Sequence, residues 1–119
     1  MEIKQIRDLY VSEIIAEEGV VHRNIRHRDT EDLSDFINRD TKQLINQDLL
    51  MLTTRIKKHK GGDYSNEEKL RDLWYMKNIA INLKPYMAYV EQHYPNLADK
   101  VWKILNIELP RETKSNTTS

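Results

Sequence analysis

Three polar residues interrupt an apolar stripe in the segment from about residue 30 to residue 60. Counted at about 100° per residue, Asp48, Arg55 and His59 lie on one helical line where neighbouring turns have apolar side chains. Unpaired burial of such groups is costly. Arg55 and His59, four residues apart, could hold an anionic group in a cleft, with Asp48 orienting one of them. The alternative is that the stripe reaches solvent, or that these groups pair with tyrosines and charges on neighbouring helices.

A basic cluster occupies residues 22–29, with the sequence HRNIRHRD. Arg23, Arg26 and His27 are its candidates for contact with an anion or a nucleic acid. A cluster of this size gives weak, salt-sensitive contact with phosphates and little reading of base sequence. The basic run KKHK at 57–60 should lie at the opposite end of an antiparallel helix pair. The alternative is a solvated face whose basic residues suit the C-terminal end of a helix.

The same cluster resembles a nuclease motif. Residues 23–27, with the sequence RNIRH, resemble the Arg-polar…His motif of HEPN-type helical ribonucleases, although the spacing is one residue shorter than that family's usual minimum. Arg55 and His59 have the same short spacing. The resemblance implies cleavage of RNA by one of these pairs of arginine and histidine.

The segment from 65 to 94 has a second apolar strip beside its main seam. Trp74, Ile81 and Ala88 recur every seven residues, roughly 100° from the seam. Tryptophan and tyrosine are residue types that contribute strongly to binding energy at protein interfaces. The alternative is that this helix is central and is covered on both sides. The candidate partner-binding residues are Trp74, Tyr75, Ile81, Tyr86 and Tyr89.

Most catalytic and metal-binding arrangements are missing from the sequence. It has no paired Glu-x-x-His motifs of a di-iron bundle, no phosphate-binding Gly-Lys-Ser/Thr loop and no nucleophile beside a base. Cysteine is absent, which excludes disulfides, thiolate zinc sites and thiol nucleophiles. We therefore favour a non-catalytic protein, without a metal or a cofactor, over an enzyme.

Composition restricts the class of protein further. The 119 residues suffice for one domain with a single core. There are 19 basic and 19 acidic residues, so the net charge is zero and the chain has no overall attraction to nucleic acid or an anionic membrane. No stretch approaches the roughly 20 apolar residues that cross a bilayer, and the first residues form no apolar signal segment. We expect a cytoplasmic protein with no membrane partner.

Helical periodicity predicts the elements that position these candidates. Apolar residues at a 3.6 period predict helices from about residue 2 to 28, 30 to 60 and 65 to 94. The third helix should continue through a kink at Pro85, because its heptad seam keeps its register there. The seam consists of Leu73, Met76, Ala80, Leu83, Met87, Val90 and Tyr94.

Short polar motifs mark where the helices begin and end. Asp29 or Thr30 can cap the second helix, and Gly61-Gly62 ends it. Ser65 and Glu68 have the S-x-x-E spacing of a capping box, in which each side chain satisfies a free backbone N–H of the other.

The predicted fold is all-α, an up-down-up bundle of three long helices plus a short C-terminal helix. Pro95 stops the third helix, and Asn96 is expected to cap the short one. The bundle should form one domain over residues 1–107, followed by a disordered polar tail at 108–119.

A helical bundle is a scaffold for many activities, so function must be predicted from the candidate residues. The strip around Trp74 and Ile81 predicts a small interaction or accessory protein that contacts another protein or a second copy of itself. The alternative is a nucleic-acid-binding module or HEPN-like ribonuclease that uses the arginine and histidine clusters.

Overall fold

Helices make up the described part of the protein. The computed structural model describes residues 5–26 and 39–109, and no strand occurs among them. The predicted all-α class is confirmed for these residues. In chain order the elements are α1 (Gln5–Asp8), α2 (Ser12–Arg26), α3 (Arg39–Lys58), α4 (Asn66–Leu83), the 3-10 turn η1 (Lys84–Tyr86), α5 (Met87–His93) and α6 (Pro95–Asn106).

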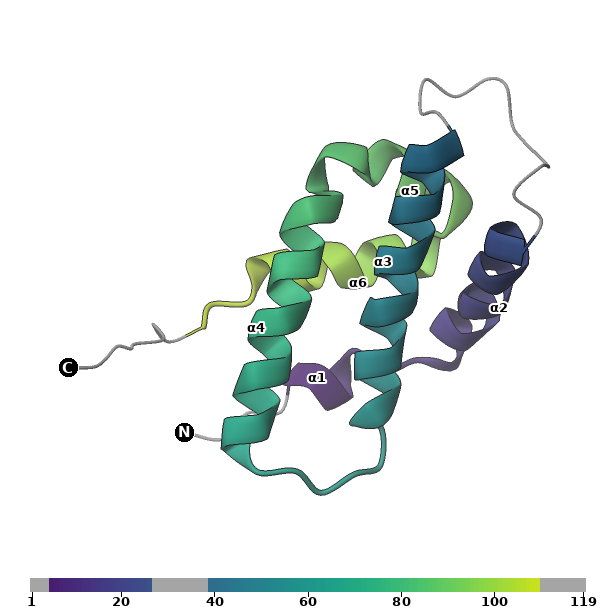
Figure 1. Ribbon diagram of the computed structural model, residues 1–119. Helices are drawn as coiled ribbons and strands as arrows, with labels where there is room; N and C mark the ends of the chain where they lie inside the picture. Colours follow the sequence, from purple (N-terminus) through teal and green to yellow (C-terminus); the bar gives the residue numbers. More distant parts are fainter. Residues whose placement is uncertain (1–4, 27–38, 110–119) are drawn as a thin grey trace.

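The centre of the fold is the antiparallel pair α3 and α4, which lie side by side (Figure 1). On one side α2 packs along α3, and α6 crosses behind the pair, where it contacts α2, α4 and α5. In the view of Figure 1 no described helix lies in front of α3 and α4. One face of this pair is therefore open, and the core lies behind it.

The first predicted helix is wrong as a single element, because the chain breaks between Asp8 and Ser12. A continuous helix would turn Leu9 well away from the face that carries Ile14. The break lets Leu9 reach the core beside Ile6, and it is only 4% exposed. Burial of Leu9 helps to offset the helical hydrogen bonds that are lost at the break.

The third predicted helix is also interrupted, at the place where Pro85 occurs. Every residue of the predicted seam, from Leu73 to Tyr94, is buried. However, α4 ends at Leu83, and η1 leads into α5. Proline has no N–H to continue the helical ladder, so the chain tightens into a 3-10 turn. The up-down-up bundle of three long helices is thus not confirmed.

The connection between α3 and α4 agrees with the local motifs. Gly61 and Gly62 follow the end of α3. Ser65 caps α4, because its Oγ accepts a hydrogen bond from the backbone N–H of Glu68 at 3.2 Å. The predicted cap at Asp29 or Thr30, the beginning of the second predicted helix and the tail from residue 110 lie outside the described residues.

The N-terminus of α6 is capped from another helix. Tyr94 is the N-cap residue and has no capping side chain, so Asn96 is not the cap that the sequence predicted. Glu17 of α2 instead accepts hydrogen bonds from the backbone N–H groups of Asn96 at 2.9 Å and Leu97 at 2.7 Å. A carboxylate there also meets the positive end of the helix dipole. Glu17 therefore fixes α6 to α2.

A buried tyrosine connects three helices in the core. Tyr94 is fully buried, and its hydroxyl donates to Oδ1 of Asn46 at 3.0 Å and accepts from Nδ2 of Asn24. Burial raises the pKa of Tyr94 above its ordinary value. The hydroxyl is thus a neutral hydrogen-bonding group that links the junction of α5 and α6 to α2 and α3.

We expect Glu17→Ala to lower the free energy of unfolding by about 1–2 kcal/mol, because it leaves N–H groups at the start of α6 without an acceptor. Urea denaturation followed by circular dichroism measures this loss. Glu13→Ala, on the exposed side of the same helix, is the matched control and should change stability by less than about 0.5 kcal/mol. Equal losses in the two variants would contradict a capping role for Glu17.

Candidate functional site: the open face of α3 and α4

A stripe of four residues runs along the open side of α3. Leu44, Asp48, Met51 and Arg55 follow one another at intervals of 4, 3 and 4 residues, the spacing at which one helix presents a seam to another. Leu44 is 63% exposed and Met51 is also exposed. The core of α3 is formed by a neighbouring line of residues, Ile45, Leu49, Leu52 and Ile56. The stripe is therefore a second, outward seam of this helix.

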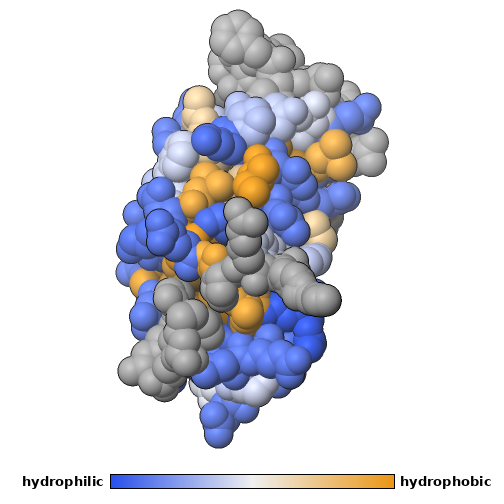
Figure 2. All heavy atoms as spheres, turned by 90° about the vertical axis from the view of Figure 1, so that its left-hand side faces the viewer, coloured by the Kyte–Doolittle hydropathy of each residue, from blue (hydrophilic) through white to orange (hydrophobic). Residues whose placement is uncertain are grey.

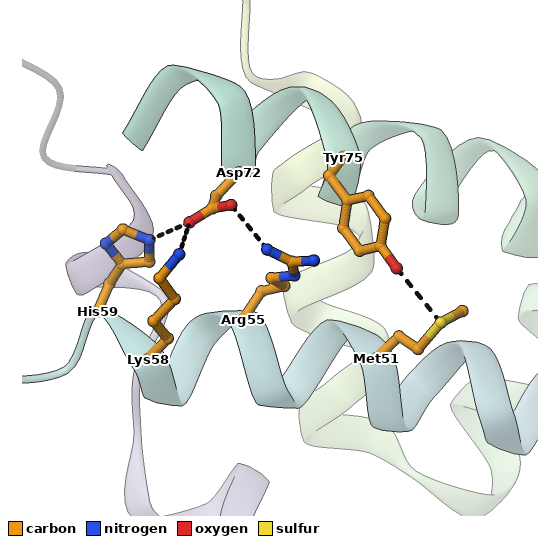
Figure 3. A network of polar contacts seen from close by, with 6 residues as sticks. All are labelled: Met51, Arg55, Lys58, His59, Asp72 and Tyr75. Carbon is orange, nitrogen blue, oxygen red and sulfur yellow. Dashed lines mark hydrogen bonds and ion pairs between the residues drawn. The ribbon is translucent and has the colours of Figure 1, made fainter. Parts of the chain in front are cut away.

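The anion that Arg55 and His59 hold is a carboxylate of the protein itself. Asp72 of α4 accepts hydrogen bonds from Arg55 Nη1 at 2.9 Å, Lys58 Nζ at 2.9 Å and His59 Nε2 at 2.6 Å (Figure 3). Asp72 is 3% exposed and His59 is 2% exposed. Asp72, and not Asp48, orients this pair, which corrects the prediction. In this arrangement His59 has no access to an external substrate.

The His59 ring is enclosed by residues of α4 and of the connection between α3 and α4. Asp72 accepts the proton of Nε2, while Nδ1 is buried and without a hydrogen-bond partner among the described residues. The ring of Tyr64 packs against His59 with 4.4 Å between centroids. A Cβ at Gly62 would overlap the Tyr64 ring, so glycine allows this packing.

The charges around Asp72 determine its pKa. Burial acts to raise the pKa, but hydrogen bonds from His59 and Lys58 and the positive charges of Lys58 and Arg55 lower it by more. The net result is a pKa below the ordinary value of 3.8. Asp72 therefore stays ionised at neutral pH, and the cluster ties α3 to α4.

Asp48 has the opposite environment, at one end of the open face. It is partly buried in a groove of about 250 Å³, and it has neither an ion pair nor a hydrogen bond to any described residue. Burial raises the pKa of Asp48 above its ordinary value. The groove thus offers one uncompensated carboxylate within apolar walls. It is lined by Thr41, Leu44, Ile45, Asp48, Asn82, Leu83 and Tyr86.

Aromatic side chains cover the middle of the open face. Tyr75 of α4 contacts Sδ of Met51 through its hydroxyl at 3.4 Å, and the guanidinium carbon of Arg55 lies 4.2 Å from the centroid of its ring (Figure 3). Tyr75 and Tyr86 are each 37% exposed. Two of the three tyrosines that the sequence suggested for partner binding thus lie on this face. We call it the α3–α4 face, defined by Leu44, Asp48, Met51, Arg55, Tyr75, Asn82 and Tyr86.

The other predicted partner-binding residues do not join this face. Tyr89 is 8% exposed and belongs to the core, so its assignment to a binding surface is wrong. Ile81 is 52% exposed, whereas Trp74 is partly buried. These two are turned by more than a quarter of the helix circumference from Tyr75. The predicted strip therefore divides into a core residue, an outer side of α4 and the α3–α4 face.

Figure 2 shows hydrophobic side chains gathered along the middle of the side of the molecule that carries α4 and the end of the described chain. The chain contributes its own cover there, because Leu105, Ile107 and Leu109 pack against the core. Lys77 of α4 also donates a hydrogen bond to the backbone carbonyl of Ile107. Part of this surface is thus already used within the protein.

The basic cluster is only partly described. Arg23 is exposed near the end of α2. The side chain of Arg26 and the whole of His27 lie outside the described residues, so the nuclease-like motif stays a prediction. Among the described residues, no three histidine, aspartate or glutamate side chains are placed to hold a metal ion. None of the described helices has both the length and the apolar character to cross a bilayer.

Comparisons with protein-family models, with curated proteins and with solved structures gave no match to this chain. The function is therefore argued from the site. Sequence reasoning singled out Asp48, Arg55 and His59, but it missed the roles of Leu44 and Met51 on the same stripe and of Asp72 on α4. For Leu44 and Met51 the sequence contained a signal, because the charged residues Asp48 and Arg55 lie on the same stripe and are unusual in a core.

We expect Asp72→Asn to lower the free energy of unfolding at pH 7 by about 2 kcal/mol, because it removes the charged acceptor that Arg55, Lys58 and His59 share. The loss is moderated because the side chains of Arg55 and Lys58 are 35% and 34% exposed and can regain water. Asp48→Asn is the matched control, the same chemical change at an unpaired carboxylate, and should be neutral or stabilising by up to about 1 kcal/mol. Urea denaturation of both variants distinguishes the two sites.

The pH dependence of the free energy of unfolding should show the contribution of the ionised Asp72. The folded pKa of Asp72 is below its unfolded value, so its stabilisation is complete above the unfolded pKa and is lost as the pH falls through the folded one. The difference in stability between the wild type and Asp72→Asn should be constant from pH 7 to about pH 5 and shrink below about pH 4. A constant difference down to pH 3 would contradict ionisation of Asp72 as the cause.

Proposed function

We propose that this protein is a non-catalytic helical interaction protein that binds another protein molecule through the α3–α4 face. One observation supports this above the others. Of the six large hydrophobic side chains that are exposed among the described residues, four lie on this face, namely Leu44, Met51, Tyr75 and Tyr86. Scattered exposed hydrophobic residues are ordinary, but a contiguous group beside a groove is typical of an interaction site.

The form of the face indicates a helix as the bound element. A groove between two antiparallel helices, bordered by a 4, 3, 4 seam, accepts the side chains of a third helix in the manner of helix-in-groove recognition. The tyrosines of the face provide large contact areas with few side-chain torsions to order. The partner helix should place apolar residues on Met51 and Tyr75.

The charge of the groove specifies one further property of the partner. Asp48 is unpaired and partly removed from water, so an approaching arginine or lysine would compensate a charge that the folded protein leaves alone. A phosphate backbone would be repelled by Asp48, the carboxylate in the groove. These features favour a basic and apolar protein helix over a nucleic acid.

A photocrosslinking experiment in cells that produce the protein tests this function. A benzophenone amino acid in place of Tyr86 should give a discrete adduct with a protein, and Leu44→Asp on the same groove should abolish the adduct. Ile81→Asp, an equivalent change on the outer side of α4, should leave it intact. Circular dichroism should show both aspartate variants folded, since both positions are exposed in the described structure.

Two outcomes contradict the proposed function. One is the absence of any protein adduct from position 86 and from a second probe at Tyr75. The other is an adduct that persists with Leu44→Asp and disappears with Ile81→Asp, which would transfer the contact to the outer side of α4.

A further inference from the structure

The partner helix described above has a close counterpart in the protein itself. It must present apolar residues beside a basic one, and α3 has Leu44, Met51 and Arg55 on one exposed stripe. We propose that the α3–α4 face binds a second copy of this chain about a two-fold axis beside Met51, with Asp48 of each copy paired with Arg55 of the other. This inference rests on the proposed function and specifies which protein the α3–α4 face binds.

The two charges are placed symmetrically about the proposed axis. Asp48 lies three residues before Met51 and Arg55 lies four residues after it, and all three belong to one stripe of α3. A two-fold axis that crosses α3 at Met51 exchanges the two ends of the stripe. Each Asp48 then faces the Arg55 of the second copy, and the same pair forms twice, as an isologous interface requires.

Arg55 is prepared for a second carboxylate. Its side chain is 35% exposed, and the atom that Asp72 engages is Nη1. A guanidinium has five N–H donors in a fixed plane, so further donors remain for Asp48 of the second copy. The guanidinium carbon lies 4.2 Å from the centroid of the Tyr75 ring, which keeps the group extended over the face. Little side-chain entropy is then lost when the pair forms.

The groove has room for the approaching side chain. Asp48 lies in the groove of about 250 Å³ with Leu44 and Tyr86 on its walls. The methylene stem of Arg55 from the second copy can lie along these apolar walls while its charged head reaches the carboxylate. The pair would thus bury apolar surface and compensate Asp48 in the same contact.

The overall charge of the chain does not oppose self-association. Nineteen basic and nineteen acidic residues give a net charge of zero, so two copies have no long-range repulsion to overcome. A chain with zero net charge has no long-range attraction for a strongly charged partner. A second copy of the chain is therefore the favoured partner.

Cysteine crosslinking tests the axis directly, because the chain contains no cysteine of its own. In Met51→Cys the two new thiols should face each other, and a disulfide requires Cα atoms within about 7 Å. Mild oxidation should convert Met51→Cys to a covalent dimer at least about tenfold faster than Ile81→Cys, which places an equally accessible thiol on the outer side of α4. Circular dichroism should show that both variants are folded.

Light scattering over a concentration series measures the equilibrium. The wild type should shift from monomer to dimer. Asp48→Lys should weaken the dimer at least about tenfold, because the introduced ammonium group would face Arg55 of the second copy. Asp63→Lys, in the exposed connection between α3 and α4, makes the same change of charge away from the face and should leave the dimer intact.

Three results would overturn the inference. A wild type that stays monomeric at all concentrations, with a Leu44-dependent adduct to a different protein, excludes the second copy and leaves the proposed function standing. A dimer that crosslinks faster through position 81 places the two-fold axis on the outer side of α4. A monomer with no adduct from position 86 or position 75 contradicts both the inference and the proposed function.

Discussion

Asp72 is a carboxylate that the fold removes almost completely from water, and the pairing of α3 with α4 has to neutralise it. Three donors of α3 converge on it, the cations Arg55 and Lys58 and the ring of His59. Sliding α4 by one turn, about 5.4 Å, would separate all three from the carboxylate and leave a buried unpaired charge. Apolar contacts alone discriminate weakly between neighbouring turns, because the heptad seam repeats. The charge therefore sets the register of the two helices.

Carboxylates also attach α2 to the rest of the molecule. Glu18 is buried and accepts hydrogen bonds from Thr53 at 3.0 Å and Lys57 at 2.8 Å, both on α3. The adjacent Glu17 points to α6 and caps its N-terminus. Two neighbouring glutamates thus fix one helix to two others. Specific polar pairs at helix contacts determine which neighbour each helix accepts, while apolar burial supplies most of the stabilisation.

These internal pairings explain why the open face combines exposed apolar residues with an unpaired carboxylate. The cations at the end of α3 are satisfied by Asp72, so Asp48 is left alone among apolar residues at the far end of the stripe. Leu44 and Met51 stay exposed because α6 covers the opposite side of the helix pair. A face with an apolar seam, one acid and one partly engaged arginine is suited to a helix of similar composition. That composition is what a second α3 offers.

Local features of the fold could be predicted from the sequence because they depend on residues close together in the chain. The Ser65 cap and the buried seam from Leu73 to Tyr94 follow from backbone hydrogen bonding and helical periodicity, whereas the helix that was predicted to continue through Pro85 is interrupted there. The periodicity also singled out Arg55, but it could not identify Asp72 as its partner or Glu17 as the cap of α6. A helical pattern indicates the direction in which a side chain points from the axis of its own helix. Which helix lies in that direction is decided by tertiary packing.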